Sequence, residues 1–266
     1  MEIIGYILAI FVGLSLGLVG SGGSILTVPL LVYFFGISPE IATSYSLFIV
    51  GSVSGLGAFF KFRKDEVNLR IAFLFGVTSI ITVFLTRKFI FPAIPDILLS
   101  AGGFQLTKSF VLMMLFALLI LFSSIYVLKD KQDHRTPLPV QTSLFTLIVW
   151  GLLIGLITGF LGAGGGFLIV PVLMFLFNAP IKVATGTSLT IIAANTLLGG
   201  LGDLGHISLD WGLLLMLLLI TTSGLIIGMA VSKRIDSQKL SRAFGWFLML
   251  MAVTIILLEL FGHFPG

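Results

Sequence analysis

Long stretches without a charged residue constrain this chain more than any other feature of its sequence. Residues 71–86, 110–128, 213–231 and 244–258 contain no Asp, Glu, Lys or Arg and are mostly apolar. A helix needs about 20 apolar residues to cross the hydrocarbon core of a bilayer, which is about 30 Å thick. Charged residues make up 10% of the 266 residues, compared with about 25% in an average soluble domain. The sequence therefore predicts an integral membrane protein.

The rest of the composition excludes several classes of protein. The chain has no cysteine, which rules out disulfides and cysteine-bound metals. His134, His206 and His263 lie on three different stretches without metal-ligand spacing, and no catalytic triad can be drawn. The 15 basic residues lie at segment ends, unlike a nucleic-acid surface. We expect no enzyme, cofactor, metal or nucleic-acid partner; the expected partners are the lipid bilayer and a small solute.

Glycine, proline and charge clusters divide the chain into ten apolar segments. They are residues 3–20, 25–36, 41–60, 69–90, 108–128, 142–161, 166–178, 183–202, 209–232 and 243–262. The second and seventh have only 12 and 13 residues, or about 18–20 Å of helix. Each follows a glycine cluster and contains a proline. We expect each to form half of a broken or re-entrant hairpin with the segment before it.

The chain contains an internal repeat. Residues 13–47 align with residues 155–189 without a gap, and 15 of the 35 positions are identical. Two residues that this constant offset superimposes are called equivalent below. The pattern predicts two related units of five segments, residues 1–128 and 142–266. The polar residues 129–141 between them have the composition of a solvated linker.

Basic residues indicate the orientation, because cytoplasmic loops carry the excess of Lys and Arg. If both short segments are hairpin arms, the extracytoplasmic side carries only Arg87, Lys88 and Lys108, and the other 12 basic residues lie in the cytoplasm. Both termini are then extracytoplasmic and the linker is cytoplasmic. An odd number of crossings in each unit makes the second repeat inverted relative to the first. Inverted repeats with broken helices at matching positions are typical of secondary transporters.

Two glycine-rich strings occupy matching positions in the repeats. They read GLVGSGGSILTVP at residues 17–29 and GFLGAGGGFLIVP at residues 159–171, followed by ATS at residues 42–44 and ATGTS at residues 184–188. With these motifs the chain resembles the TauE/SafE family of sulfite exporters over nearly its whole length. The resemblance implies a bacterial inner-membrane permease for sulfite or small organosulfur anions, linked to the breakdown of taurine and related sulfonates.

The glycine strings are also suited to binding an anion. Backbone N–H groups at a helix start carry about half a positive charge, and glycine lets a ligand approach them closely. Nearby hydroxyl and amide groups can complete the shell. The predicted substrate-binding residues are Gly22, Gly23, Ser24, Thr43, Ser44, Ser46, Gly164, Gly165, Gly166, Thr185, Thr187, Ser188 and Asn195.

Simpler interpretations stand beside this one. Gly13/Gly17, Gly51/Gly55, Gly155/Gly159 and Gly224/Gly228 have the spacing of helix-packing glycines. A Ser or Thr hydroxyl can also bond its own helix backbone.

Asp203 and His206 are candidates for proton coupling, although residues at a membrane interface would look the same. We expect an all-α carrier that moves a small sulfur-containing anion by alternating access. The alternatives are a carrier of another small anion or a cation, or a membrane scaffold that transports nothing.

Overall fold

The computed structural model describes residues 2–20, 23–101, 104–129, 144–162, 164–176, 179, 181–203, 207, 209–231 and 237–261. Nearly all of these residues are helical, as expected for an all-α membrane protein. The long helices are α1 (Glu2–Val19), α2 (Ser24–Phe35), α3 (Pro39–Phe62), α4 (Leu69–Leu85), α6 (Lys108–Lys129), α7 (Leu144–Leu161), α8 (Gly166–Leu176), α9 (Ile181–Asp203), α10 (Trp211–Val231) and α11 (Ser237–Leu260). Six helices in the described part of the chain are long and apolar enough to cross a membrane, judged by length and composition.

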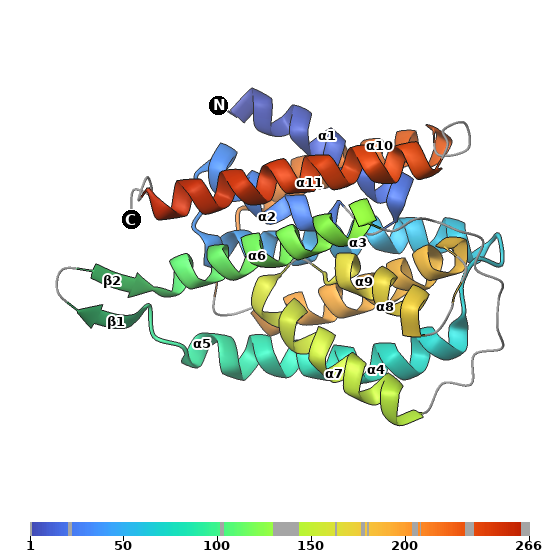
Figure 1. Cartoon of the computed structure of the whole chain (residues 1–266), viewed down its shortest axis with the longest axis horizontal. Helices are drawn as coiled ribbons and strands as arrows, with labels where there is room; N and C mark the ends of the chain where they lie inside the picture. The colour runs from blue at the N-terminus through green and yellow to red at the C-terminus, as the bar shows by residue number, and fades with distance from the viewer. Residues whose placement is uncertain are drawn as a thin grey trace.

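Short elements lie between α4 and α6. A π-helical turn, η1 (Thr86–Ile90), and a short helix, α5 (Phe91–Ala93), continue α4. Strands β1 (Ile97–Ala101) and β2 (Phe104–Thr107) then pair as an antiparallel hairpin. The hairpin projects beyond the helices, at the end of the molecule where α1 begins and α11 ends (Figure 1). The loop between α3 and α4 lies at the opposite end (Figure 1).

Helix starts recur at the spacing of the sequence repeat. The helices α2 and α4 begin at positions equivalent to the first residues of α8 and α10 respectively. The contacts between helices follow the same correspondence, because α1 packs on α10 while α4 packs on α7. The pairs α3 with α9, α6 with α11 and α2 with α8 also contact each other. In Figure 1, α6 runs away from the hairpin end and α11 runs back toward it.

Hydrogen bonds at the ends of the helices show how the sequence specifies these boundaries. Asn68 accepts a bond from Ile71 N at the start of α4, and Asp210 accepts bonds from Gly212 N and Leu213 N at the start of α10. Such caps satisfy backbone donors that have no partner within the helix. Asn68 and Asp210 are equivalent in the two repeats, so matching polar residues start matching helices.

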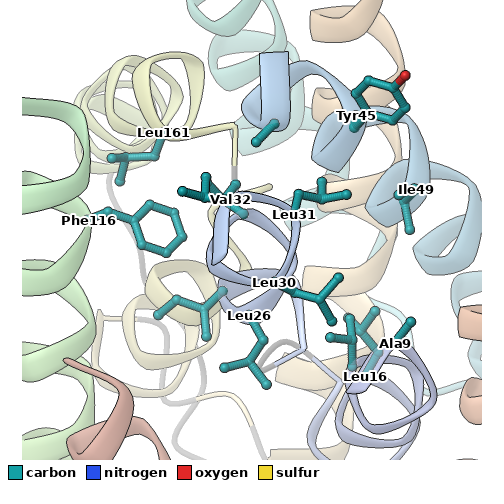
Figure 2. Close-up of a cluster of buried hydrophobic side chains, with 14 of the residues drawn as sticks. Ala9, Leu16, Leu26, Leu30, Leu31, Val32, Tyr45, Ile49, Phe116 and Leu161 are labelled. Carbon is teal, nitrogen blue, oxygen red and sulfur yellow. The ribbon is translucent and has the colours of Figure 1, made fainter. Parts of the chain in front are cut away.

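The short helix α2 lies inside the molecule. All nine residues from Ser24 to Val32 are buried. Leu26, Leu30, Leu31 and Val32 pack against apolar side chains from α1, α3, α6 and α7 (Figure 2). This packing gives a helix of 12 residues its tertiary support, since an isolated helix of that length is marginal in water.

Glycines bring several helix pairs into close contact. A Cβ on Gly13 or Gly17 of α1 would overlap the α10 backbone, and a Cβ on Gly224 or Gly228 of α10 would overlap the α1 backbone. Gly155 and Gly159 of α7 are in close contact with α4 and η1, and Gly51 of α3 with α9. The helix-packing prediction is confirmed for these glycines. At Gly55 a Cβ would make only an ordinary contact, 3.8 Å from the Cβ of Ala193.

The first residue of each glycine turn touches the other half of the chain. Gly20 ends α1 with φ +79°, and Gly162 ends α7 with φ +65°. Their N–H groups donate to the carbonyl oxygens four residues earlier, at 2.8 and 2.9 Å. A Cβ on Gly20 would collide with the side chain of Thr185, and one on Gly162 would collide with Thr43. Only glycine therefore fits at positions 20 and 162.

The predicted segments agree closely with the helices, but the region after α4 differs from expectation. The hairpin of β1 and β2 was not predicted. Arg87 and Lys108, at the ends of their predicted segments, are buried. Helical structure continues past α4 through η1 and α5, and Lys108 donates to Phe91 O of α5 at 2.8 Å. The linker 129–141 lies outside the described residues apart from Lys129, which ends α6.

The glycine packing between α1 and α10 predicts a difference between two Gly→Ala variants. Gly13→Ala forces the helices apart and should lower the free energy of unfolding by about 1–3 kcal/mol, the usual effect of overpacking. Gly55→Ala, also inside a helix, has room for its methyl group and gains helix propensity. Thermal unfolding in detergent would measure both; equal midpoints would contradict the packing described.

The contact between Gly162 and Thr43 has a matched control at Gly36. Both glycines have φ +65°, but a Cβ on Gly36 would meet nothing within 4 Å. Each Gly→Ala change carries a left-handed backbone cost of about 1–2 kcal/mol. Only Gly162→Ala adds a collision, so its unfolding midpoint should fall clearly below that of Gly36→Ala. An equal fall of the unfolding midpoint in both variants would show that position 162 is not in tight contact with Thr43.

Candidate functional site

The start of α8 lies at the middle of the molecule. Gly164, with φ +69°, contacts Val50 of α3 and both Ile192 and Thr196 of α9. Val50 and Ile192 are each the twelfth residue of their helix. The turn from Gly162 to Gly164 therefore carries the chain from the beginning of α3 to the centre of the α3–α9 pair, where the backbone N–H groups of α8 begin.

Thr158 of α7 stands beside this helix start. A Cβ on Gly165, the residue before α8, would collide with the Thr158 hydroxyl. Thr158 is fully buried, and no described residue hydrogen-bonds its Oγ1. No motif in the sequence marks this residue. Its position three residues after Gly155, on the glycine face of α7, is the signal that could have identified it.

The start of α2 is buried in a similar way. Gly23 packs against Val12, Ser15 and Leu16 of α1, and Ser24 is fully buried. These contacts place the start of α2 one to two turns back along α1 from the turn at Gly20. The predicted binding residue Gly22 lies outside the described residues. Because α2 and α8 contact each other, the two half-helices meet inside the protein.

Two of the predicted hydroxyl residues hydrogen-bond to the backbone. Thr43 Oγ1 donates to Glu40 O at 2.7 Å, and Thr187 Oγ1 accepts a bond from Asn68 N at 2.9 Å. Ser46 and Ser188 differ from these. Both are fully buried, they are equivalent in the two repeats, and neither hydroxyl has a hydrogen-bond partner in the described chain.

The predicted residues do not form one cluster. Thr185 precedes Asp203 by 18 residues of α9, roughly 27 Å of helix, and Asp203 bonds Ser44, the residue after Thr43. Thr43 and Thr185 therefore lie toward opposite ends of the α3–α9 pair. Ser46 and Ser188 are separated for the same reason. Gly164, Gly165 and Gly166, at the beginning of α8, lie between these two ends.

Asn195 belongs to the central region of α9. It is fully buried, and its Nδ2 donates to Ser79 Oγ of α4 at 2.6 Å. Among the described residues, none donates to Asn195 Oδ1. The carbonyl of Ser79 in turn lies against Gly155 of α7. This contact joins α4, α7 and α9 around the start of α8.

Asp203 occupies the end of α9 and is 5% exposed. Its Oδ2 accepts a hydrogen bond from Ser44 at 2.5 Å and lies 3.5 Å from Arg87 Nη2. Sequence reasoning missed Arg87 because two adjacent basic residues at the end of the segment 69–90 are typical of a membrane interface. The other proton-coupling candidate, His206, lies outside the described residues. In the part of the chain that is described, no group of His, Asp and Glu could hold a metal ion.

Comparisons with known proteins agree with the membrane architecture. The family model described as Sulfite exporter TauE/SafE matches residues 6–255. A probable membrane transporter protein of Xylella fastidiosa (strain 9a5c) is 30% identical over 250 residues, covering 92% of this chain and 91% of that protein. The probable membrane transporter protein YdhB of Bacillus subtilis is 28% identical over 219 residues, covering 81% and 84% respectively.

A match also extends to an archaeal protein. The probable membrane transporter protein MJ0441 of Methanocaldococcus jannaschii is 30% identical over 113 residues, covering 40% of this chain and 42% of that protein. No solved structure matches the chain. Because the family model spans nearly the whole sequence, the chain belongs to the sulfite exporter TauE/SafE family of membrane transporters.

Proposed function

We propose that this protein is a secondary transporter that moves a small sulfur-containing anion, such as sulfite or an organosulfonate, by alternating access. The observation that carries the proposal is the buried start of α8, where Gly164 lies against the middle of α3 and α9. Helix starts inside a membrane protein present oriented N–H groups to an anion. The sulfur chemistry of the cargo comes from the family to which the chain belongs.

A transporter must bind its substrate and also release it. The partial positive charges at the helix starts are suited to both steps because they attract an anion only moderately. A fully charged side chain at the centre of a membrane is costly, and it would hold an anion strongly. The starts of α2 and α8 instead offer backbone dipoles, and α7 places the Thr158 hydroxyl beside the start of α8. We assign Thr43 and Ser46 to the part of the substrate path toward one end of the molecule, and Thr185 and Ser188 to the part toward the other.

An inverted repeat supports alternating access, because two halves of opposite orientation can exchange shapes. Three observations favour it. The helices α2 and α4 begin at positions equivalent to the starts of α8 and α10, the contacts between the halves follow the same correspondence, and α6 and α11 run in opposite directions (Figure 1). We place ten segments in the bacterial plasma membrane, with both termini outside and the linker in the cytoplasm, as the distribution of basic residues indicates.

Flux in proteoliposomes tests the proposed function. Purified protein should carry sulfite or sulfoacetate down an imposed gradient, with acetate, chloride and sodium as competing candidates and protein-free liposomes as the blank. Movement of a sulfur anion alone supports the family-based substrate. Transport confined to another ion would overturn the substrate class. A folded protein that moves no ion would favour a scaffold.

Thr158→Val tests the start of α8, with Thr190→Val as its control. The Thr158 hydroxyl bonds no described residue, so its loss should leave unfolding unchanged or slightly stabilise the protein. Sulfite flux should nevertheless fall roughly tenfold through one lost hydrogen bond to an anion. Thr190 donates to Gly186 O at 3.0 Å, and its replacement should leave flux unchanged. Equal flux in both variants would remove Thr158 from the binding site.

A further inference from the structure

Arg87 is the largest fully buried side chain in the described part of the protein. Its guanidinium carries five N–H donors in a planar fork. No described residue accepts a hydrogen bond from Nε, Nη1 or Nη2. Its Nη2 lies 3.5 Å from Asp203 Oδ2, beyond the usual N–H···O distance. A permanently charged group with free donors is therefore enclosed in the protein.

The counter-ion of Arg87 is partly engaged elsewhere. Asp203 Oδ2 accepts a closer bond, 2.5 Å, from Ser44. On its other side, the Arg87 guanidinium lies 4.7 Å from the centre of the Phe91 ring. The ring also contacts the ammonium of Lys108, which donates to Phe91 O at 2.8 Å. Arg87 thus has charge compensation from Asp203 and stacking from Phe91, while its hydrogen-bonding capacity is unused.

The backbone at Arg87 is also unusual. Arg87 is the second residue of η1, whose closing bond runs from Phe91 N to Thr86 O. Such π turns are rare and often occur at functional sites. Arg87 is 18 residues from the start of α4, roughly 27 Å along the helix axis. This places it toward the end of the molecule where α9 also ends.

The arrangement is absent from the other repeat. The residues equivalent to Ser44, Asp203 and Arg87 are Gly186, Lys61 and Met229. Lys61 pairs with Glu66 at 2.6 Å, and both side chains are partly exposed. Helix packing that is common to both halves therefore does not require a buried Arg–Asp pair. Because the buried Arg87–Asp203 pair occurs at only one end of the molecule, it is suited to a transport step at that end.

We propose that Arg87 receives the transported oxyanion at this end of the molecule, and that Asp203 occupies the guanidinium when the anion is absent. The inference rests on the proposed function as an anion carrier. Two oxygens of a sulfite or sulfonate group match the spacing of a guanidinium fork, which is the geometry of strong bidentate binding. Exchange between Asp203 and the anion gives Arg87 a counter-ion in both states, and the displaced Asp203 carboxylate keeps its hydrogen bond from Ser44.

Sulfite uptake into proteoliposomes, measured over a range of concentrations, tests the exchange through the apparent KM. Arg87→Gln should raise the KM roughly tenfold to a hundredfold, as expected for loss of a charged hydrogen bond. Asp203→Asn removes the competitor and should lower the KM, the opposite direction. Lys88→Gln is the matched control, because Lys88 is the next residue of η1 and is exposed; its KM should equal that of the wild type.

A double variant guards against misfolding. Arg87→Gln with Asp203→Asn removes both charges together, so no uncompensated charge is buried, and its KM should stay as high as that of Arg87→Gln. If the pair only supports the fold, the single variants would lower the unfolding temperature and the KM would not move. That result would overturn the inference.

Sulfite uptake by the wild type distinguishes a failure of the Arg87 inference from a failure of the proposed function. If the wild type takes up sulfite and the KM is unchanged in Arg87→Gln and in the double variant, the role of Arg87 is wrong. The proposed function is then unaffected. A wild type that neither takes up sulfite nor gains thermal stability from it would overturn the proposed function, and the role of Arg87 with it.

Discussion

Each half of this chain interrupts a helix inside the protein, and the backbone groups freed by that break are the constraint on which the rest of the structure depends. A helix start leaves its first N–H groups without partners in the helix, and burial makes such groups costly unless something bonds them. Membrane proteins accept irregular backbone only where it is buried in protein or lines a cavity. The starts of α2 and α8 are therefore natural places for a polar ligand.

Glycine makes these two breaks possible. Gly20 and Gly162 turn the chain in the left-handed region and pass so close to Thr185 and Thr43 that a side chain would collide. Each turn is thus braced by a helix from the opposite half. The halves depend on one another for their turns, and a rearrangement of one half would be felt at the helix start of the other. The proposed carrier mechanism requires such coupling, because the two halves exchange shapes.

The sequence was sufficient to predict an all-α membrane protein and the approximate extent of its helices, because apolar length and glycine clusters can be read directly along the chain. The glycines of α1, α7 and α10 were likewise recognisable from their four-residue spacing. The separation of Thr43 from Thr185 was not predictable, since it follows from the antiparallel crossing of α3 and α9, shown by the bond from Ser44 to Asp203. Arg87 was placed at the end of the segment 69–90 but not in a site, because no sequence pattern marks the π turn that buries it.

The location of a bound oxyanion tests the central claim most directly. Selenite has the shape and charge of sulfite, and its selenium scatters X-rays anomalously, so crystals of the protein soaked in selenite would reveal its position. We expect an anomalous peak within hydrogen-bond distance of the backbone N–H groups at Gly164–Gly166 and of the Thr158 hydroxyl. Saturating selenite that leaves this position empty, or that binds only at the protein surface, would contradict the claim that the buried helix starts hold the substrate.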